Sequence, residues 1–156
     1  MERAYDGTVS DSPPTLTGLT TYLLSKVGKE ARSRLTARLA ERELRLWHMA
    51  VLAALADFGP DAQRPLAERL GIHVSDMARI LDELSRTGHV VRERDPADRR
   101  RVLVTLTPQG RALLAGLMDE ATAVQDEMLA PLTARERATL QRLLLRIYTE
   151  AEGRKG

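Results

Sequence analysis

The sequence contains no cysteine, few aromatic residues and no long run of apolar residues. Without cysteine, the chain cannot form disulfides, bind iron–sulfur clusters or thiolate zinc, or sense redox state through a thiol. Its longest apolar runs, such as Met49 to Ala56, are much shorter than the roughly 20 residues that a bilayer-spanning helix needs. The polar segment Met1 to Thr15 has no apolar stretch typical of a secretory signal. We therefore expect a cytoplasmic protein with no membrane partner.

The motifs of common catalytic and cofactor sites are also missing. The three histidines, His48, His73 and His89, form no HExxH or HxH pair that could bind a metal ion. No GxxxxGK[ST], GxGxxG or GxSxG motif is present, so neither a phosphate-binding loop nor a serine hydrolase elbow is indicated. The sequence therefore predicts a protein that is not an enzyme and that has no metal or cofactor.

Leucine and alanine dominate what is present. The chain has 156 residues, of which 25 are leucine and 20 are alanine, and only 3% are aromatic. This length is typical of one domain, and strong helix formers greatly outnumber aromatic strand formers. We expect one compact, mostly helical unit.

Charge is unevenly distributed along the chain. The net charge is only +2, but the segment from Arg86 to Arg111 has seven arginines and three acidic residues. Of the 24 basic residues, 21 are arginine, whose planar guanidinium suits bidentate recognition of phosphate or guanine. A GC-rich genome could explain the overall preference for arginine. It does not explain the cluster.

Apolar periodicity predicts about six helices. Two of them are short, flank the turn Gly71-Ile72-His73, and form a helix-turn-helix. Thr107-Pro108 predicts a helix start, and Thr133 with Glu136 predicts a capping box. The expected helices span approximately residues 16–41, 43–57, 66–70, 74–87, from 108 to just before 131, and from 133 onward.

After Gly88 the pattern changes to the two-residue period of strands. Val91 and Glu93 alternate with arginines, and a second alternating segment begins at Val102. The segment between them, Asp95 to Arg100, contains turn-forming Asp and Pro. A β-hairpin with an arginine-rich tip is therefore predicted directly after the helix-turn-helix.

This order of elements resembles the multiple antibiotic resistance regulator (MarR) family of winged-helix transcription factors. The resemblance extends from about Leu16 to Ala151. Its most specific part is similar to the family's wing signature, D-x-R-x-x-x-V-x-L-T, and is supported by the segment from Leu66 to Ile72 and by Arg79. The signature residues are Asp98, Arg100, Val104, Leu106 and Thr107.

The resemblance implies a mainly α winged helix (α+β), with a two-stranded β-hairpin wing, that forms an intertwined helical homodimer. From the residues alone, the terminal helices could equally close a bundle within one chain or bury their apolar faces against a second copy. With the family, we expect five segments: a flexible N-terminal arm at 1–15, a dimerisation helix at 16–42, a DNA-binding lobe at 43–107, dimerisation helices at 108–152, and a frayed tail at 153–156.

The predicted DNA contacts lie on the second helix of the motif and on the wing. The first turns of this second helix, which reach base edges in helix-turn-helix proteins, carry Ser75, Asp76 and Arg79. Asp76 could instead interact favourably with the helix dipole. The other candidates are Arg86, the wing residues Arg99, Arg100 and Arg101, and His73, which contacts phosphate or is an ordinary turn residue.

The resemblance points to Arg100 as the principal wing arginine, whereas Arg99 and Arg101 could contact phosphate or only water. A carboxylate is repelled by phosphates, so Asp98 is expected to brace the wing by accepting hydrogen bonds. Asp82 and Glu83 are expected to form intrahelical pairs with Arg79 or Arg86.

Many members of the family release DNA when a small aromatic or anionic molecule binds between the dimer helices and the DNA-binding lobe. The resemblance makes Tyr22, Trp47 and His48 candidates for lining such a pocket. The alternative is that Trp47 anchors the core and His48 is a buried histidine with satisfied hydrogen bonds.

The sequence thus predicts a DNA-binding transcriptional regulator, a repressor by family resemblance. It would bind a pseudo-palindromic operator as a homodimer and be released by a small-molecule effector. Its expected partners are double-stranded DNA, a second copy of the chain, and the effector. Two alternatives stay open: a nonspecific architectural DNA-binding protein, and a winged-helix interaction module without DNA binding.

Overall fold

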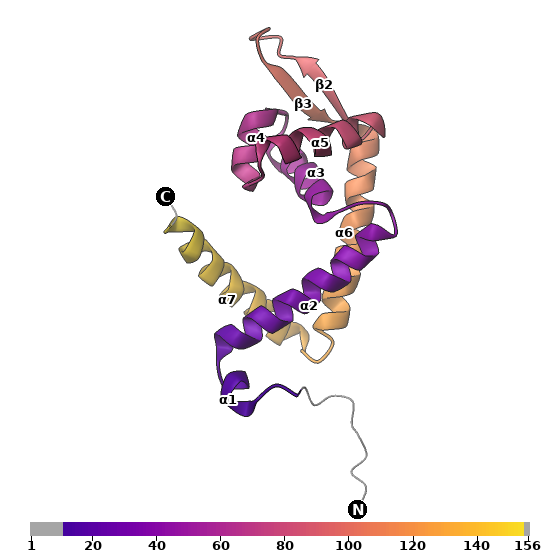
Figure 1. Ribbon diagram of the computed structural model, residues 1–156. Helices are drawn as coiled ribbons and strands as arrows, with labels where there is room; N and C mark the ends of the chain where they lie inside the picture. Colours follow the sequence, from indigo (N-terminus) through magenta and orange to yellow (C-terminus); the bar gives the residue numbers. More distant parts are fainter. Residues whose placement is uncertain (1–10, 155–156) are drawn as a thin grey trace, which may run out of the picture.

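The computed structural model describes residues 11–154 and places seven helices and three strands in them (Figure 1). The expected mainly α winged-helix architecture is confirmed. The predicted arm at 1–15 and tail at 153–156 fall partly outside the described residues. Within 11–154, no helix is long and apolar enough to cross a membrane.

The core lies in a lobe built from three helices and a small sheet. Helices α3 (Leu46–Phe58), α4 (Gln63–Leu70) and α5 (Val74–Arg86) pack against one another. Leu39 and Leu117, from two of the long helices outside the lobe, are also fully buried in this core. The lobe supplies most of its buried side chains, among them Val51, Leu52, Leu55, Leu66, Met77, Ile80, Leu81, Leu84, Val90 and Val104.

The sheet is antiparallel and has the strand order β1-β3-β2. Strands β2 (Val90–Arg94) and β3 (Val102–Leu106) form the predicted hairpin, which projects from the lobe (Figure 1). The two-residue strand β1 (Asp61–Ala62) pairs with the other edge of β3. The wing is therefore anchored to the segment between α3 and α4.

Three long helices lie outside the lobe. Helix α2 (Thr20–Ala40) packs against α6 (Pro108–Met128), and α7 (Ala134–Gly153) diverges from both (Figure 1). Arginines of α2 pair with glutamates of α6: Arg38 with Glu120 at 3.2 Å and with Glu127, and Arg42 with Glu120 at 3.3 Å. These pairs connect α2 to α6 outside the apolar core.

The structure differs from the sequence prediction at four places, one of which is the start of α4, at Gln63 rather than at 66. The first long helix is divided into α1 (Pro14–Thr17) and α2, because Gly18 ends α1 and Leu19 has extended backbone angles. Helix α3 begins at Leu46 rather than at 43, since Glu43 has a positive φ of 57° that no α-helix allows. Strand β1 was not predicted.

The first turn of α6 packs closely on the backbone that leads into the wing. Thr107 accepts a hydrogen bond from the N–H of Gly110 at 3.0 Å, and its hydroxyl donates to the Gly88 carbonyl at 2.7 Å. A Cβ atom at Gly110 would lie 2.1 Å from the carbonyl oxygen of His89 and 2.6 Å from Cδ1 of Leu106. The packing of α6 on the wing therefore requires glycine at position 110.

Gly110→Ala is expected to destabilise the protein by about 1–3 kcal/mol, because backbone must move to admit the methyl group. Urea unfolding at a fixed protein concentration measures this difference. Gly28→Ala in α2 is the control: within residues 11–154, no atom beyond its chain neighbours and the nearby backbone of its own helix lies within 4 Å of its Cβ position. Alanine there should leave stability unchanged or raise it by up to about 1 kcal/mol. Wild-type stability of Gly110→Ala would contradict the close packing.

Candidate nucleic-acid interface

The second helix of the helix-turn-helix, α5, has one buried face and one exposed face. Met77, Ile80, Leu81 and Leu84 are buried against the rest of the lobe. This burial fixes the rotation of α5 about its axis. Apart from Val74 in the first turn, the exposed residues are the polar ones that the amphipathic pattern predicts: Ser75, Asp76, Arg79, Asp82 and Arg86.

His73 is the N-cap residue of α5. Its Nδ1 accepts the backbone N–H of Ser75 at 3.2 Å and lies 2.7 Å from the Ser75 hydroxyl oxygen. The preceding turn contains Gly71 in the left-handed region, with φ 65°, which permits the sharp reversal after α4. His73 therefore has a structural role at the start of α5, and its exposed ring could still contact a phosphate.

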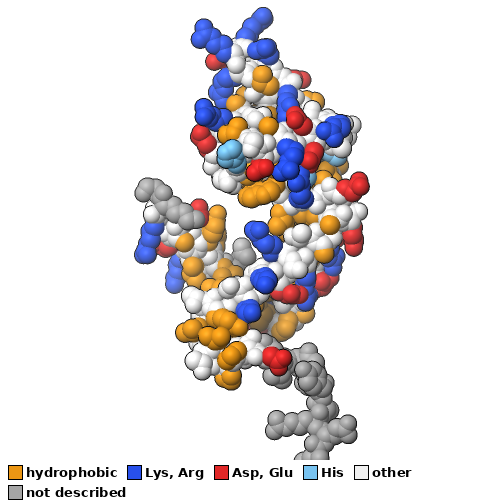
Figure 2. Space-filling view, viewed as in Figure 1, with side chains coloured by type: hydrophobic (Ala, Val, Ile, Leu, Met, Phe, Trp, Pro, Cys, Tyr) orange, Lys and Arg blue, Asp and Glu red, His pale blue; other side chains and the backbone are white. Residues whose placement is uncertain are grey.

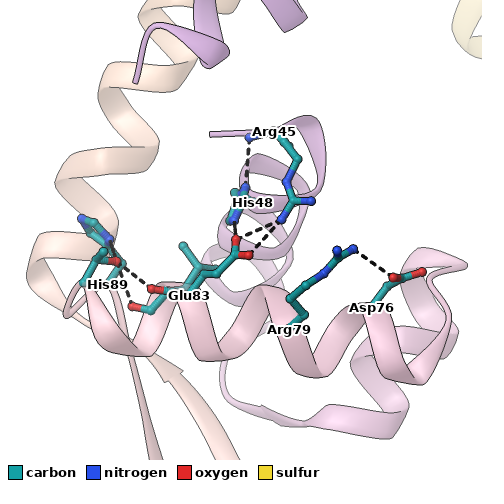
Figure 3. A network of polar contacts seen from close by, with 8 residues as sticks. Arg45, His48, Asp76, Arg79, Glu83 and His89 are labelled. Atoms are coloured by element: carbon teal, nitrogen blue, oxygen red, sulfur yellow. Dashed lines mark hydrogen bonds and ion pairs between the residues drawn. The ribbon is translucent and has the colours of Figure 1, made fainter. Parts of the chain in front are cut away.

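Asp76 and Arg79 form an ion pair on the exposed face of α5, with 3.0 Å between Oδ1 and the guanidinium (Figure 3). Both side chains are more than half exposed. Exposed pairs of this kind contribute about 0–1 kcal/mol, so Arg79 can leave Asp76 at little cost when another acceptor is available.

Hydrogen bonds within the turn hold the wing tip. The backbone N–H groups of Ala97 and Arg100 donate to the carboxylates of Asp95 and Asp98, at 2.9 and 3.0 Å. Arg94 donates to the Arg99 carbonyl at 2.7 Å. Two backbone hydrogen bonds, from Asp95 to the Arg101 carbonyl and from Arg101 to the Asp98 carbonyl, close the turn as well, and the Asp98 side chain braces it as one of the acceptors.

The arginines of the basic segment divide into two groups. Arg92 pairs with Asp82 of α5 at 2.7 Å, and Arg101 lies 3.8 Å from Asp61 in β1. The side chains of Arg99 and Arg100 have neither an ion pair nor a hydrogen bond within residues 11–154. Basic side chains gather at the free end of the hairpin (Figure 2). The tip therefore offers two guanidinium groups to an external acceptor.

Glu83 joins α5 to the N-terminus of α3. Its Oε2 lies 2.6 Å from Nε2 of His48, and its two carboxylate oxygens accept from Arg45 at 3.0 and 3.1 Å (Figure 3). Hydrogen bonding from His48 holds the pKa of Glu83 below its ordinary value, opposed by partial burial, and Arg45 lowers it further.

The predicted intrahelical pairs of Asp82 and Glu83 with Arg79 or Arg86 are wrong. Both carboxylates instead pair with residues of other elements, Arg92 in β2 and Arg45 with His48 in α3. No local sequence signal could have found these partners, since Arg45 precedes Glu83 by 38 residues.

A cavity of about 300 Å³ lies between the α2–α3 junction, α5 and α6. His48 is among its lining residues, but Tyr22 and Trp47 are not. The hydroxyl of Tyr22 donates to Oγ of Ser12, and Trp47 is 46% exposed. The structure therefore brings only one of the three predicted pocket residues to this cavity. It also does not show Trp47 as a core anchor, whereas His48 is buried with both ring nitrogens bonded.

The lowered pKa of Glu83 gives a pH-dependent prediction. A carboxyl group whose pKa is lower in the folded chain stabilises the fold above its unfolded pKa, about 4.3. This contribution is lost as the pH falls through the folded value. Glu83→Gln should therefore be less stable than wild type near pH 7, and the difference should shrink towards about pH 3. Urea unfolding of both proteins across this pH range measures the difference in their free energies of unfolding.

Glu68→Gln is the control, because the exposed carboxylate of Glu68 has no ion pair within residues 11–154. It should change stability little at any pH. A stability difference for Glu83→Gln that is the same near pH 7 and pH 3 would contradict the assigned interaction.

Sequence comparisons agree on one family. The family model described as MarR family matches residues 43–101. The transcriptional repressor NicR of Pseudomonas putida is 26% identical over 144 residues, which cover 92% of this chain and 91% of NicR. The transcriptional regulator HosA of Escherichia coli is 34% identical over 95 residues, which cover 61% of this chain and 70% of HosA.

Solved structures agree with the sequence comparisons. A cysteine-to-serine mutant of Escherichia coli MarR, complexed with operator DNA, matches with a TM-score of 0.67 and 26% identity over 87% of this chain and 99% of its own. BpsR of Bordetella bronchiseptica, whose DNA binding is regulated by 6-hydroxynicotinic acid, matches with a TM-score of 0.69 and 26% identity. That match covers 88% of this chain and 98% of BpsR. The chain belongs to the MarR family of winged-helix transcriptional regulators.

Proposed function

We propose that this regulator is a sequence-specific DNA-binding repressor that acts as a homodimer and is released by a small-molecule effector. The observation that carries the proposal is the pair of arginines Arg99 and Arg100 at the tip of the wing, whose side chains have no ion pair or hydrogen bond within residues 11–154, on the same lobe as the exposed face of α5. The other wing arginines are engaged by protein acceptors.

In the proposed complex, α5 enters the major groove and the wing contacts the flanking minor groove. Arg79, in the second turn of α5, can present two N–H groups to O6 and N7 of guanine. Arg100, with Arg99 beside it, meets the negative potential of a narrow minor groove or the backbone phosphates. A two-fold dimer would place the two copies of α5 in major grooves about 10 base pairs apart.

The apolar surface of α7 supports a dimer. No residue of α7 is buried, and Leu145, Ile147 and Tyr148 are more than half exposed. Apolar side chains also gather along α7 and around α1 in Figure 2. A contiguous apolar surface of this kind is typical of an interface, and the homodimer is the commonest soluble assembly.

The cavity beside His48 is the proposed effector site. Arg42, Arg86 and His89 line it together with the carboxylates Glu43 and Glu83, so it offers both donors and acceptors to a small polar molecule, and its arginines could bind an acid group. BpsR, regulated by 6-hydroxynicotinic acid, shows that a protein with this fold can respond to an aromatic acid. Because the cavity contacts both α5 and the α2–α3 junction, a ligand bound there could change the position of the lobe.

The dimer and the effector are tested together. Sedimentation equilibrium should give twice the chain mass of 17.4 kDa. Titrating aromatic carboxylic acids into the complex of dimer and DNA should release DNA from wild type. It should release less from Arg42→Ala, which removes a cationic group of the cavity. A monomer, or equal release from both proteins, would contradict this part of the proposal.

Substitution of Arg100 and Arg79 should have different effects on DNA binding. Arg100→Ala should weaken binding to operator and random DNA alike, and should reduce the slope of log K against log salt by about 0.9 for each phosphate that is no longer neutralised. Arg79→Ala should reduce the discrimination between operator and random DNA by about 1–3 kcal/mol. Fluorescence anisotropy titrations on both DNAs, at several salt concentrations, measure these effects.

Arg135→Ala, at the exposed start of α7, removes the same charge far from the wing and is the matched control. Its operator affinity should remain close to that of wild type. Unchanged affinity and salt dependence in Arg100→Ala would show that the wing does not contact DNA. Equal losses on both DNAs in Arg79→Ala would make Arg79 a phosphate contact.

A further inference from the structure

We infer that Glu83, held by His48 and Arg45, is a positioning residue that sets where α5 lies relative to the α2–α3 junction and thereby sets affinity for the operator. The inference rests on the proposed DNA-binding function and assigns a role to a residue that faces the protein. The three side chains come from α5 and from the start of α3, and they meet on the side of α5 that also carries Arg79 (Figure 3).

The hydrogen bonds of His48 fix its orientation and its tautomer. Nδ1 accepts a hydrogen bond at 3.0 Å from the backbone N–H of Arg45, which is the N-cap residue of α3. In a neutral imidazole, the other nitrogen must then carry the proton, so Nε2–H donates to Glu83 at 2.6 Å. One ring thus caps α3 and bonds α5 at the same time.

The His48 end of this contact is rigid. His48 is 2% exposed and lies in the first turn of α3, which also places Val51, Leu52 and Leu55 in the core. A buried ring with both nitrogens bonded cannot change its rotamer without breaking a hydrogen bond. Glu83 is therefore held by a fixed partner, and Arg45 adds a second contact to the same carboxylate.

The contact lies where the long helices meet the lobe. Glu43, two residues before Arg45, has a φ of 57°, and this turn connects α2 to α3. Glu83 is therefore tied to the segment through which a change in α2 would reach the lobe. On its own helix, Glu83 lies four residues after Arg79, on the same side and about 6 Å along the axis. A shift of α5 at Glu83 would move Arg79 with it.

Simple electrostatics predicts that removing Glu83 strengthens DNA binding, whereas a positioning role predicts that it weakens binding. The carboxylate lies in a lobe that would approach DNA phosphates, so its loss alone should strengthen binding. If Glu83 positions α5, its loss should weaken binding despite the favourable change in charge. The direction of the change in affinity therefore separates the two explanations.

The experiment compares Glu83→Ala, Glu83→Gln and Glu68→Ala with wild type, using full-length protein and the operator fragment. Glu83→Ala should lose affinity about tenfold or more, the effect of misplacing one bidentate base contact. Glu83→Gln should recover most of it, because its amide oxygen can accept from Nε2–H of His48. Glu68→Ala removes an equal charge from the exposed side of α4 and should bind as well as wild type or better.

Hydrogen–deuterium exchange without DNA provides a second readout. Glu83→Ala should exchange faster at the amides of α5, while α7 remains unchanged. Equal or tighter operator binding by Glu83→Ala, or unchanged exchange in α5, would overturn the inference. If wild type itself fails to bind operator, the proposed function is overturned. The exchange measurement would then decide separately whether Glu83 holds α5.

Discussion

The burial of one face of α5 is the constraint on which the rest of the structure depends. Four large apolar side chains, Met77, Ile80, Leu81 and Leu84, are almost completely removed from solvent. Each contributes about 1.5–3 kcal/mol relative to exposure, so rotation of this helix about its axis would be very unfavourable. The fixed rotation determines that Arg79 faces solvent and that Glu83 faces α3. The positions of these polar side chains thus follow from the burial of the apolar face of α5.

Carboxylates then determine which arginines remain available. Asp82 engages Arg92, Asp61 lies near Arg101, and Glu83 engages Arg45. These contacts connect the wing to α5 and β1, and α5 to α3, so the same charges that stabilise the lobe also remove arginines from its outer surface. Arg99 and Arg100 are left at the tip. A count of positive charges along the sequence cannot separate these two groups.

Much of the fold could be predicted from the sequence because its signals are local. Helical periodicity located the long helices, and a change of period at Gly88 located the wing. The Thr107 and Thr133 caps form as predicted, with Thr133 and Glu136 bonded reciprocally at 2.7 and 3.3 Å. The exposed face of α5 also followed from periodicity, since a regular helix places its residues at fixed angles.

The missed features depend on contacts between distant residues. Strand β1 has two residues and exists only because Asp61 and Ala62 meet β3, about 40 positions later. The partners of Asp82 and Glu83 come from other elements, and no period in the sequence encodes them. Tyr22 was assigned to a pocket by resemblance alone, yet its hydroxyl bonds Ser12. Local patterns thus predicted the elements, whereas side-chain pairing required the three-dimensional structure.

Titration of the wild-type protein onto its own upstream intergenic DNA, with random DNA as competitor, tests the central claim most directly. The account predicts binding that resists the competitor, weakens as salt is raised, and gives a footprint with two-fold symmetry. The two protected half-sites should be centred about 10 base pairs apart. Binding that random DNA competes away equally would contradict the claim of a sequence-specific regulator and favour a nonspecific architectural protein.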